Sequence, residues 1–142
     1  HEDRLKNHWE EYGSLARGRM MLGATIRAAD YIQAQRRRSE LMEEMDNIFS
    51  TYDLVITTAT LDETPLLTDK NPYPNLETPM IQVPFNLTLH PAISIRAGFS
   101  ENKMPIGVQI IGRHWEEAKL LGIAHAVEKS LSLLSIRPTD RF

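Results

Sequence analysis

Residues 84 to 112 read PFNLTLHPAISIRAGFSENKMPIGVQIIG and carry the strongest fold signal of the chain. In two places apolar side chains recur at every second residue, which predicts two strands. The first strand would place Ile93, Ile95, Ala97 and Phe99 on one face, and the second would do the same with Ile106, Val108 and Ile110. Between them, residues 98 and 100–103 have the composition of a turn. The stretch therefore predicts a strand pair.

Before this pair, residues 54–58 read LVITT and predict a third, buried strand. Helical spacing of apolar residues predicts helices over about residues 1–12, 15–49 and 115–134, with a break in the second near residues 13–23. This order predicts an α/β fold, with a partial mixed sheet of at least three strands covered by helices.

Residues 59–83 fit no regular element, because prolines at positions 65, 72, 74 and 79 interrupt them. A loop of this length is uncommon inside a compact domain. Two alternatives remain open, a functional lid or a segment that packs on a part of the protein outside this chain. The 142 residues otherwise suit a single domain over residues 1–142.

Composition excludes several classes of function. The chain has no cysteine, which rules out disulfides, zinc–thiolate sites and cysteine nucleophiles. Its net charge is −3, and its one basic run, residues 36–38, is followed directly by glutamates, so we expect no nucleic-acid partner. No apolar run approaches the roughly 18–20 residues that span a bilayer, so we expect no membrane partner and a cytoplasmic location.

Metal and cofactor motifs are also missing from the local sequence. The histidines stand at positions 1, 8, 90, 114 and 125, and no two of them have the i,i+4 spacing of a helical zinc site. No glycine-rich phosphate-binding loop occurs. The sequence therefore predicts no metal site and no cofactor, with the histidines lying on the surface.

Four segments resemble the C-terminal part of the amidase-signature hydrolases. Residues 84–95 and 104–112 are similar to that family's sequence motifs PFN, T-G-x-P-A and G-x-Q. Residues 29–38, which read ADYIQAQRRR, are similar to a helix of the family that begins with the motif A-D-Y. The strand at residues 49–60 and the closing helix also resemble family segments. Counted with residues 84–112 as one motif, these four segments lie in the family's order over about residues 15–130.

Two departures from the family pattern leave questions open. Leu89 stands where the family has glycine, and leucine has poor access to positive φ, so the turn over residues 88–91 would differ. Arg96 stands where the family has proline. It is either a selecting charge on a pocket wall or a charge that discourages pairing at a sheet edge, and we prefer the edge interpretation.

The resemblance implies hydrolysis of C–N amide bonds other than peptide bonds, or ammonia transfer from glutamine or asparagine, through an acyl-serine intermediate. The family uses two serines and a lysine, with one serine in a Gly-Ser-rich run. This chain contains no Gly-Ser-Ser, so no residue is nominated as catalytic. We expect this chain, which begins at His1, to be a C-terminal fragment of a larger amidase. The fragment would contain no Ser-Ser-Lys set of its own and would be inactive alone.

Three residues before the second strand are the candidates for a substrate pocket: Asn86, Thr88 and His90. The alternative is that Asn86 and Thr88 merely cap a turn. A small-molecule amide substrate is expected only for the full-length parent. For the chain itself we expect a homodimer, since removal from a larger sheet would expose strand edges. A non-catalytic interaction domain with the same fold is the alternative function.

Overall fold

The computed structural model describes residues 1–65, 68, 80–133 and 135–136. Its contacts divide the chain into two compact units, residues 1–38 and residues 39–142. The single domain expected over residues 1–142 stays a prediction.

Residues 1–38 form short helices and the beginning of a long one. These are α1 (Glu2–Asn7), the 3₁₀ helix η1 (Trp9–Glu11), α2 (Ser14–Gly23) and the first part of α3 (Ala28–Thr51). The prediction of one helix over residues 15–49 with a break near 13–23 was wrong in its boundaries, because the break falls at residues 24–27. There the Thr25 hydroxyl donates to the Leu22 carbonyl at 2.7 Å, which competes with continuation of the helix.

Residues 39–142 contain a three-stranded sheet. Its strands are β1 (Val55–Thr58), β2 (Ala92–Phe99) and β3 (Pro105–Ile111), in the order β1-β3-β2. Both pairings among the described strands are antiparallel, with Ile56 opposite Ile110 and Ile93 opposite Ile110. The α/β class and the prediction of at least three strands are confirmed.

A β-bulge interrupts the alternation predicted for β2. The register shifts between Arg96 and Gly98, so Ala97 is the extra residue on its strand. Ala97 and Phe99 therefore do not continue the buried face of Ile93 and Ile95, and Phe99 is exposed. The prediction of one continuous face was wrong beyond Arg96.

Arg96, which lies beside the bulge, binds an unexpected part of the chain. Its Nη1 donates to the Ile136 carbonyl at 3.0 Å, and its Nη2 donates to the Leu133 carbonyl. The strand does lie at an edge of the described sheet, as the edge interpretation requires. The side chain nevertheless binds the segment after the last helix, which neither alternative anticipated.

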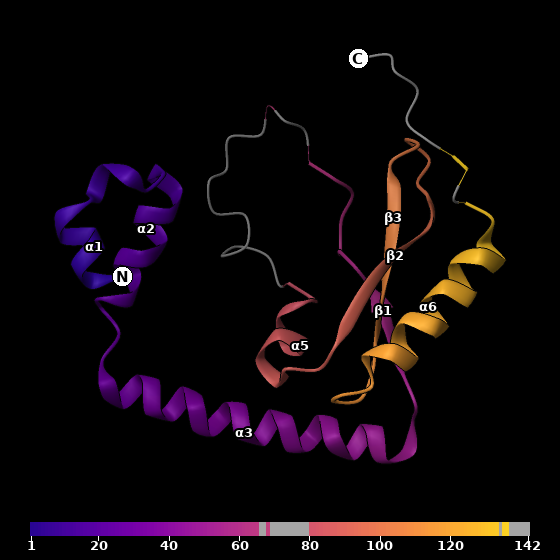
Figure 1. Ribbon diagram of the computed structural model, residues 1–142, viewed down its shortest axis with the longest axis horizontal. Coiled ribbons are helices and arrows are strands. Elements are labelled where there is room, and N and C mark those ends of the chain that lie inside the picture. The colour runs from indigo at the N-terminus through magenta and orange to yellow at the C-terminus, as the bar shows by residue number, and fades with distance from the viewer. Residues whose placement is uncertain (66–67, 69–79, 134, 137–142) are drawn as a thin grey trace. The chain divides into compact units, whose positions relative to one another are not determined.

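Helices cover both faces of the sheet. On one face, Ile95 and Ile110 pack against Leu120 and Ala124 of α6 (Glu117–Leu131), which is shorter than the predicted helix over residues 115–134. On the other face, Ile111 packs with Phe49 of α3 and Phe85 of α5 (Val83–Thr88). Figure 1 shows α5 and α6 on opposite sides of the strands.

Helix α5, which the sequence analysis did not predict, precedes β2. Pro84 stands in its first turn, where a missing N–H costs nothing. The helix ends at Leu89, whose φ of 62° and ψ of 19° are left-handed. The expected loss of positive φ at this position was wrong, because the leucine adopts the conformation in spite of its Cβ.

The predicted loop over residues 59–83 lies mostly outside the described residues. Its described ends, residues 59–65 and 80–82, contain no helix or strand. Across the described part of the chain, no helix combines the length and apolar character needed to cross a bilayer.

Candidate functional site

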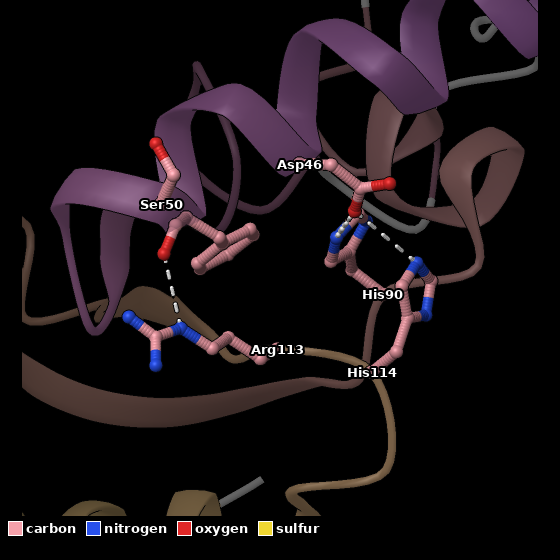
Figure 2. A pocket seen from close by; sticks show the side chains of 6 residues that line it. Asp46, Ser50, His90, Arg113 and His114 are labelled. Atoms are coloured by element: carbon pink, nitrogen blue, oxygen red, sulfur yellow. Dashed lines mark hydrogen bonds and ion pairs between the residues drawn. The ribbon is translucent and has the colours of Figure 1, made fainter.

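A cavity of about 430 Å³ opens beside the C-terminal part of α3. Its lining comes from three segments that are far apart in the sequence: α3, the connection from α5 to β2, and the turn after β3 (Figure 2). The lining residues are Asp46, Phe49, Ser50, His90, Arg113 and His114. All belong to the unit formed by residues 39–142.

His90 is the most enclosed polar group of the cavity, with 1% of its side chain exposed. Its ring stacks on Phe49 at a centroid distance of 4.8 Å and lies 3.9 Å from the ring of His114. The left-handed Leu89 turns the chain from α5 toward the strand at this point, which sets the direction of the His90 side chain. Packing from both sides therefore fixes the imidazole.

The hydrogen bonds of Thr88 determine the tautomer of His90. The Thr88 hydroxyl donates to the Pro84 carbonyl at 3.0 Å, and the His90 Nδ1 lies 2.9 Å from the same oxygen. Because a hydroxyl has one proton, the Thr88 oxygen must accept from the Nδ1–H. The neutral imidazole then carries its lone pair on Nε2, which faces Asp46 in Figure 2.

Asp46 and the two imidazoles face one another without a hydrogen bond. The Asp46 Oδ1 lies 3.6 Å from the His90 Nε2 and 4.0 Å from the His114 Nε2, and both distances exceed hydrogen-bond length. Neither Nε2 has a hydrogen-bond partner among the residues that the structure describes. Burial, and then the neighbouring His114, lower the pKa of His90, and the Asp46 carboxylate only partly opposes this shift. The pKa shift favours the neutral ring.

On the other side of the cavity, Arg113 and Ser50 form hydrogen bonds with backbone carbonyls at the end of α3. The Arg113 Nε donates to the Phe49 carbonyl at 3.0 Å, and its Nη2 donates to the Tyr52 carbonyl at 3.4 Å. These bonds satisfy carbonyls at the C-terminal end of α3, where a cation also suits the helix dipole. The Ser50 hydroxyl donates to the Asn47 carbonyl at 2.7 Å within the helix, so it is not paired with a base.

Of the three candidate residues from the sequence, the structure brings two together. Thr88 and His90 are buried and hydrogen-bonded to each other. Asn86 is exposed on α5 and is not among the described residues that line the cavity. The bond from Thr88 to Pro84 closes the last turn of α5, as the capping alternative proposed, and it also orients His90.

Sequence reasoning missed Asp46, His114 and Arg113. His114 and His90 are 24 positions apart, and Asp46 is 44 positions before His90, so no local spacing connects them. One weak signal existed, because Asp46 precedes Phe49 and Ser50 by three and four residues and shares their helix face. In chemical terms, two imidazoles and one carboxylate are a ligand set that suits transition metals, and their ligand atoms lie within 4.8 Å of one another.

Comparisons with known proteins find one family model and several similar chains. A family model described as Amidase matches residues 6–121. A glutamyl-tRNA(Gln) amidotransferase subunit of Halothermothrix orenii is 34% identical over 137 residues, which are 91% of this chain and 28% of that protein.

Two solved structures have a similar fold. A crystal structure of an amidase matches 93% of this chain and 32% of its own, with a TM-score of 0.80 and 23% identity, which shows the fold alone. A 6-aminohexanoate cyclic dimer hydrolase complexed with substrate matches 79% of this chain and 26% of its own, with a TM-score of 0.65 and 28% identity. The chain thus spans 28% of the first relative and comparable shares of these two structures.

Proposed function

Because the chain belongs to the amidase family, we propose that it is the C-terminal portion of an amidase that hydrolyses C–N amide bonds through an acyl-serine intermediate. The observation that carries this proposal is the family match over residues 6–121. The whole protein would act on a small-molecule amide.

In this proposal the chain supplies the frame and one wall of the substrate pocket. Amide hydrolysis needs a nucleophile, a proton shuttle and oxyanion donors. No Gly-Ser-Ser run is present in the 142 residues, so the Ser-Ser-Lys set would come from another part of the protein. Of the candidates, we retain His90 as a pocket residue and Thr88 as the residue beside it whose hydroxyl orients the His90 ring. Asn86 remains a candidate for the outer rim, because it is exposed near the connection between α5 and β2.

The first experiment is an assay of the purified chain against a panel of aryl amides and aryl esters. We expect no turnover above a no-protein control. Activity that survives repurification and scales with protein concentration would show that a nucleophile lies within these residues. A serine-reactive probe followed by mass spectrometry gives a second readout, and we expect no labelled serine.

The second experiment concerns the reading frame before His1. We expect it to encode a lysine and a Gly-Ser-Ser run, and the protein that includes them to hydrolyse at least one amide of the panel. Replacement of the serine in that run by alanine should abolish turnover and acylation together. If the frame holds neither feature, the amidase proposal fails.

The alternative function is a non-catalytic interaction domain. One observation favours it: a second cavity, of about 550 Å³, lies within residues 1–38 and is lined in part by Leu5, Trp9, Met20 and Met21. Apolar concave surfaces of this kind bind ligands or partner side chains. The same reading-frame experiment separates this alternative from the amidase.

For partners, we propose a homodimer of the chain, without nucleic acid or membrane, in the cytoplasm. Two observations support the homodimer: β1 and β2 lie at the edges of the described sheet, and Ile56 and Ile106 are exposed on its strands. Light scattering over a dilution series tests it. A constant mass near the 16.2 kDa of one chain would contradict it.

A further inference from the structure

We propose that Asp46, His90 and His114 form a binding site for a divalent transition-metal ion of the zinc class. The site goes beyond the proposed amide hydrolysis, because it needs no residue outside this chain. It runs against the sequence-based expectation of no metal site, which considered only the spacing of histidines within single helices.

The distances fit one ion. Two ligands bound about 2.1 Å from a tetrahedral zinc ion lie about 3.4 Å from each other. The Asp46 Oδ1 lies 3.6 Å from the His90 Nε2 and 4.0 Å from the His114 Nε2. Small rotations of the Asp46 and His114 side chains, which are 61% and 30% exposed, would close the remaining differences. The ligand atoms of all three residues lie within 4.8 Å of one another.

The orientation of His90 is that of a metal ligand. A metal-binding histidine commonly donates its other ring N–H to an oxygen, which fixes the tautomer and aims the lone pair at the ion. Here the Nδ1–H donates to the Thr88 hydroxyl, which itself donates to the Pro84 carbonyl. The stacking of Phe49 on the ring prevents rotation. The lone pair of Nε2 is therefore held in place, directed at Asp46.

The Nε2 atoms also need a partner that the described residues do not provide. Both are buried without a hydrogen bond, and the Asp46 oxygen that faces them is itself an acceptor. Buried polar atoms without a partner are rare in folded proteins, and each one calls for an explanation. A cation between the three groups satisfies all of them at once.

The ligand chemistry selects the ion. Two imidazoles and one carboxylate suit zinc, cobalt, nickel and copper, whereas magnesium and calcium prefer oxygen ligands. Ions can enter from solvent, because 61% of the Asp46 side chain is exposed at the mouth of the cavity. A bound ion would connect α3 to the segments before β2 and after β3, and so stabilise the unit of residues 39–142.

The test uses the untagged 142-residue chain, treated with a chelator and dialysed. Titration calorimetry with zinc chloride should show one equivalent bound per chain. Cobalt chloride should produce the visible absorption of a low-symmetry Co²⁺ site, and magnesium chloride should show no binding. Zinc should also raise the Tm of the wild-type chain.

Matched variants locate the ion. Asp46→Asn and His114→Gln should each weaken zinc binding at least about tenfold and remove the rise in Tm. His125→Gln, at an exposed position on α6, is the control and should bind as the wild type does. Asp46 is exposed, so Asp46→Asn tests the site even if His114→Gln does not fold. Absence of saturable zinc binding, or equal binding by Asp46→Asn and the wild type, would overturn the proposal.

Discussion

Within residues 1–38 no side chain is buried, whereas residues 39–142 hold Ile110 at 1% and Ile111 at 0% exposure. The contacts of the first unit are short-range and exposed: His1 with Tyr12, Arg4 with Glu11, and Arg17 over the ring of Trp9. Those of the second connect positions far apart, such as Arg113 with the Phe49 carbonyl.

This contrast indicates where the stability of the chain resides. Exposed ion pairs contribute little, about 0–1 kcal/mol each, because water competes for both partners. Burial of a large aliphatic side chain contributes about 1.5–3 kcal/mol. We therefore expect residues 39–142 to supply most of the stability of the structure around the His90 cavity. Residues 1–38 should contribute little to that stability.

The largest predicted effect is the loss of a buried side chain in the sheet. Ile110→Ala should lower the free energy of unfolding by about 2–5 kcal/mol, because it leaves a cavity against Leu120 and Ile95. Ile26→Ala, at an exposed position in the first unit, should change it by less than about 0.5 kcal/mol. Urea melts of both variants measure the two values, and equal losses would contradict the comparison.

A smaller loss of stability is expected from replacing Arg113, whose guanidinium binds carbonyls at the C-terminal end of α3. Arg113→Ala removes the hydrogen bonds to the carbonyls of Phe49 and Tyr52 and should cost about 1–2 kcal/mol. The matched change Arg27→Ala breaks only an exposed pair with Asp30 and should cost well under about 1 kcal/mol. Thermal melts decide it, and a larger loss from the Arg27 variant would show that the first unit is the more stable.

Leu89 offers a change in the opposite direction. Leu89→Gly should stabilise the chain by about 0.5–1 kcal/mol, because glycine adopts a φ of 62° without a Cβ clash. Little packing is lost, since 60% of the leucine is exposed. Leu121→Gly, at an equally exposed position inside α6, should instead destabilise by about 1 kcal/mol. Two variants that shift urea midpoints in the same direction would disprove the assignment of strain to Leu89.

The smallest effect is electrostatic and depends on pH. The hydrogen bond from Lys119 at 3.1 Å, its charge and then the charge of Arg113 lower the pKa of Asp53 below its usual value near 4. A carboxyl whose folded pKa is depressed stabilises the fold above its unfolded pKa, and this contribution is lost as the pH falls through the folded pKa. The melting temperatures of the wild type and Asp53→Asn should therefore converge below about pH 4. If the difference in melting temperature between the two proteins grew as the pH fell, the prediction for Asp53 would be contradicted.

The sequence predicted the sheet better than its surroundings. Alternation at Ile93, Ile95, Ile106, Val108 and Ile110 was a period-2 signal, and the α/β class follows from it. The bulge at Ala97 had no such signal, because an extra residue leaves the local pattern intact and appears only in the pairing. Helix α5 was missed because its six residues are too few to show a 3.6-residue period.

The candidate site was predicted in part for the same reason. Thr88 and His90 lie next to the strand motif, so proximity in sequence found them. His114 reaches His90 through the pairing of β3 with β2, and Asp46 reaches it through the packing of α3 on the sheet, and a single sequence does not encode either in any spacing. Leu89 shows the converse limit, since its position in the fold overrides its own poor preference for positive φ.

Hydrogen exchange of the full chain can decide whether the stable part of the structure around the cavity consists of residues 39–142 alone. We predict slow exchange for amides of β3, Phe49 and α6, close to the global unfolding limit, and fast exchange throughout α1 and α2. Equal protection of α2 and β3, or fast exchange in β3, would contradict a frame built by the second unit alone.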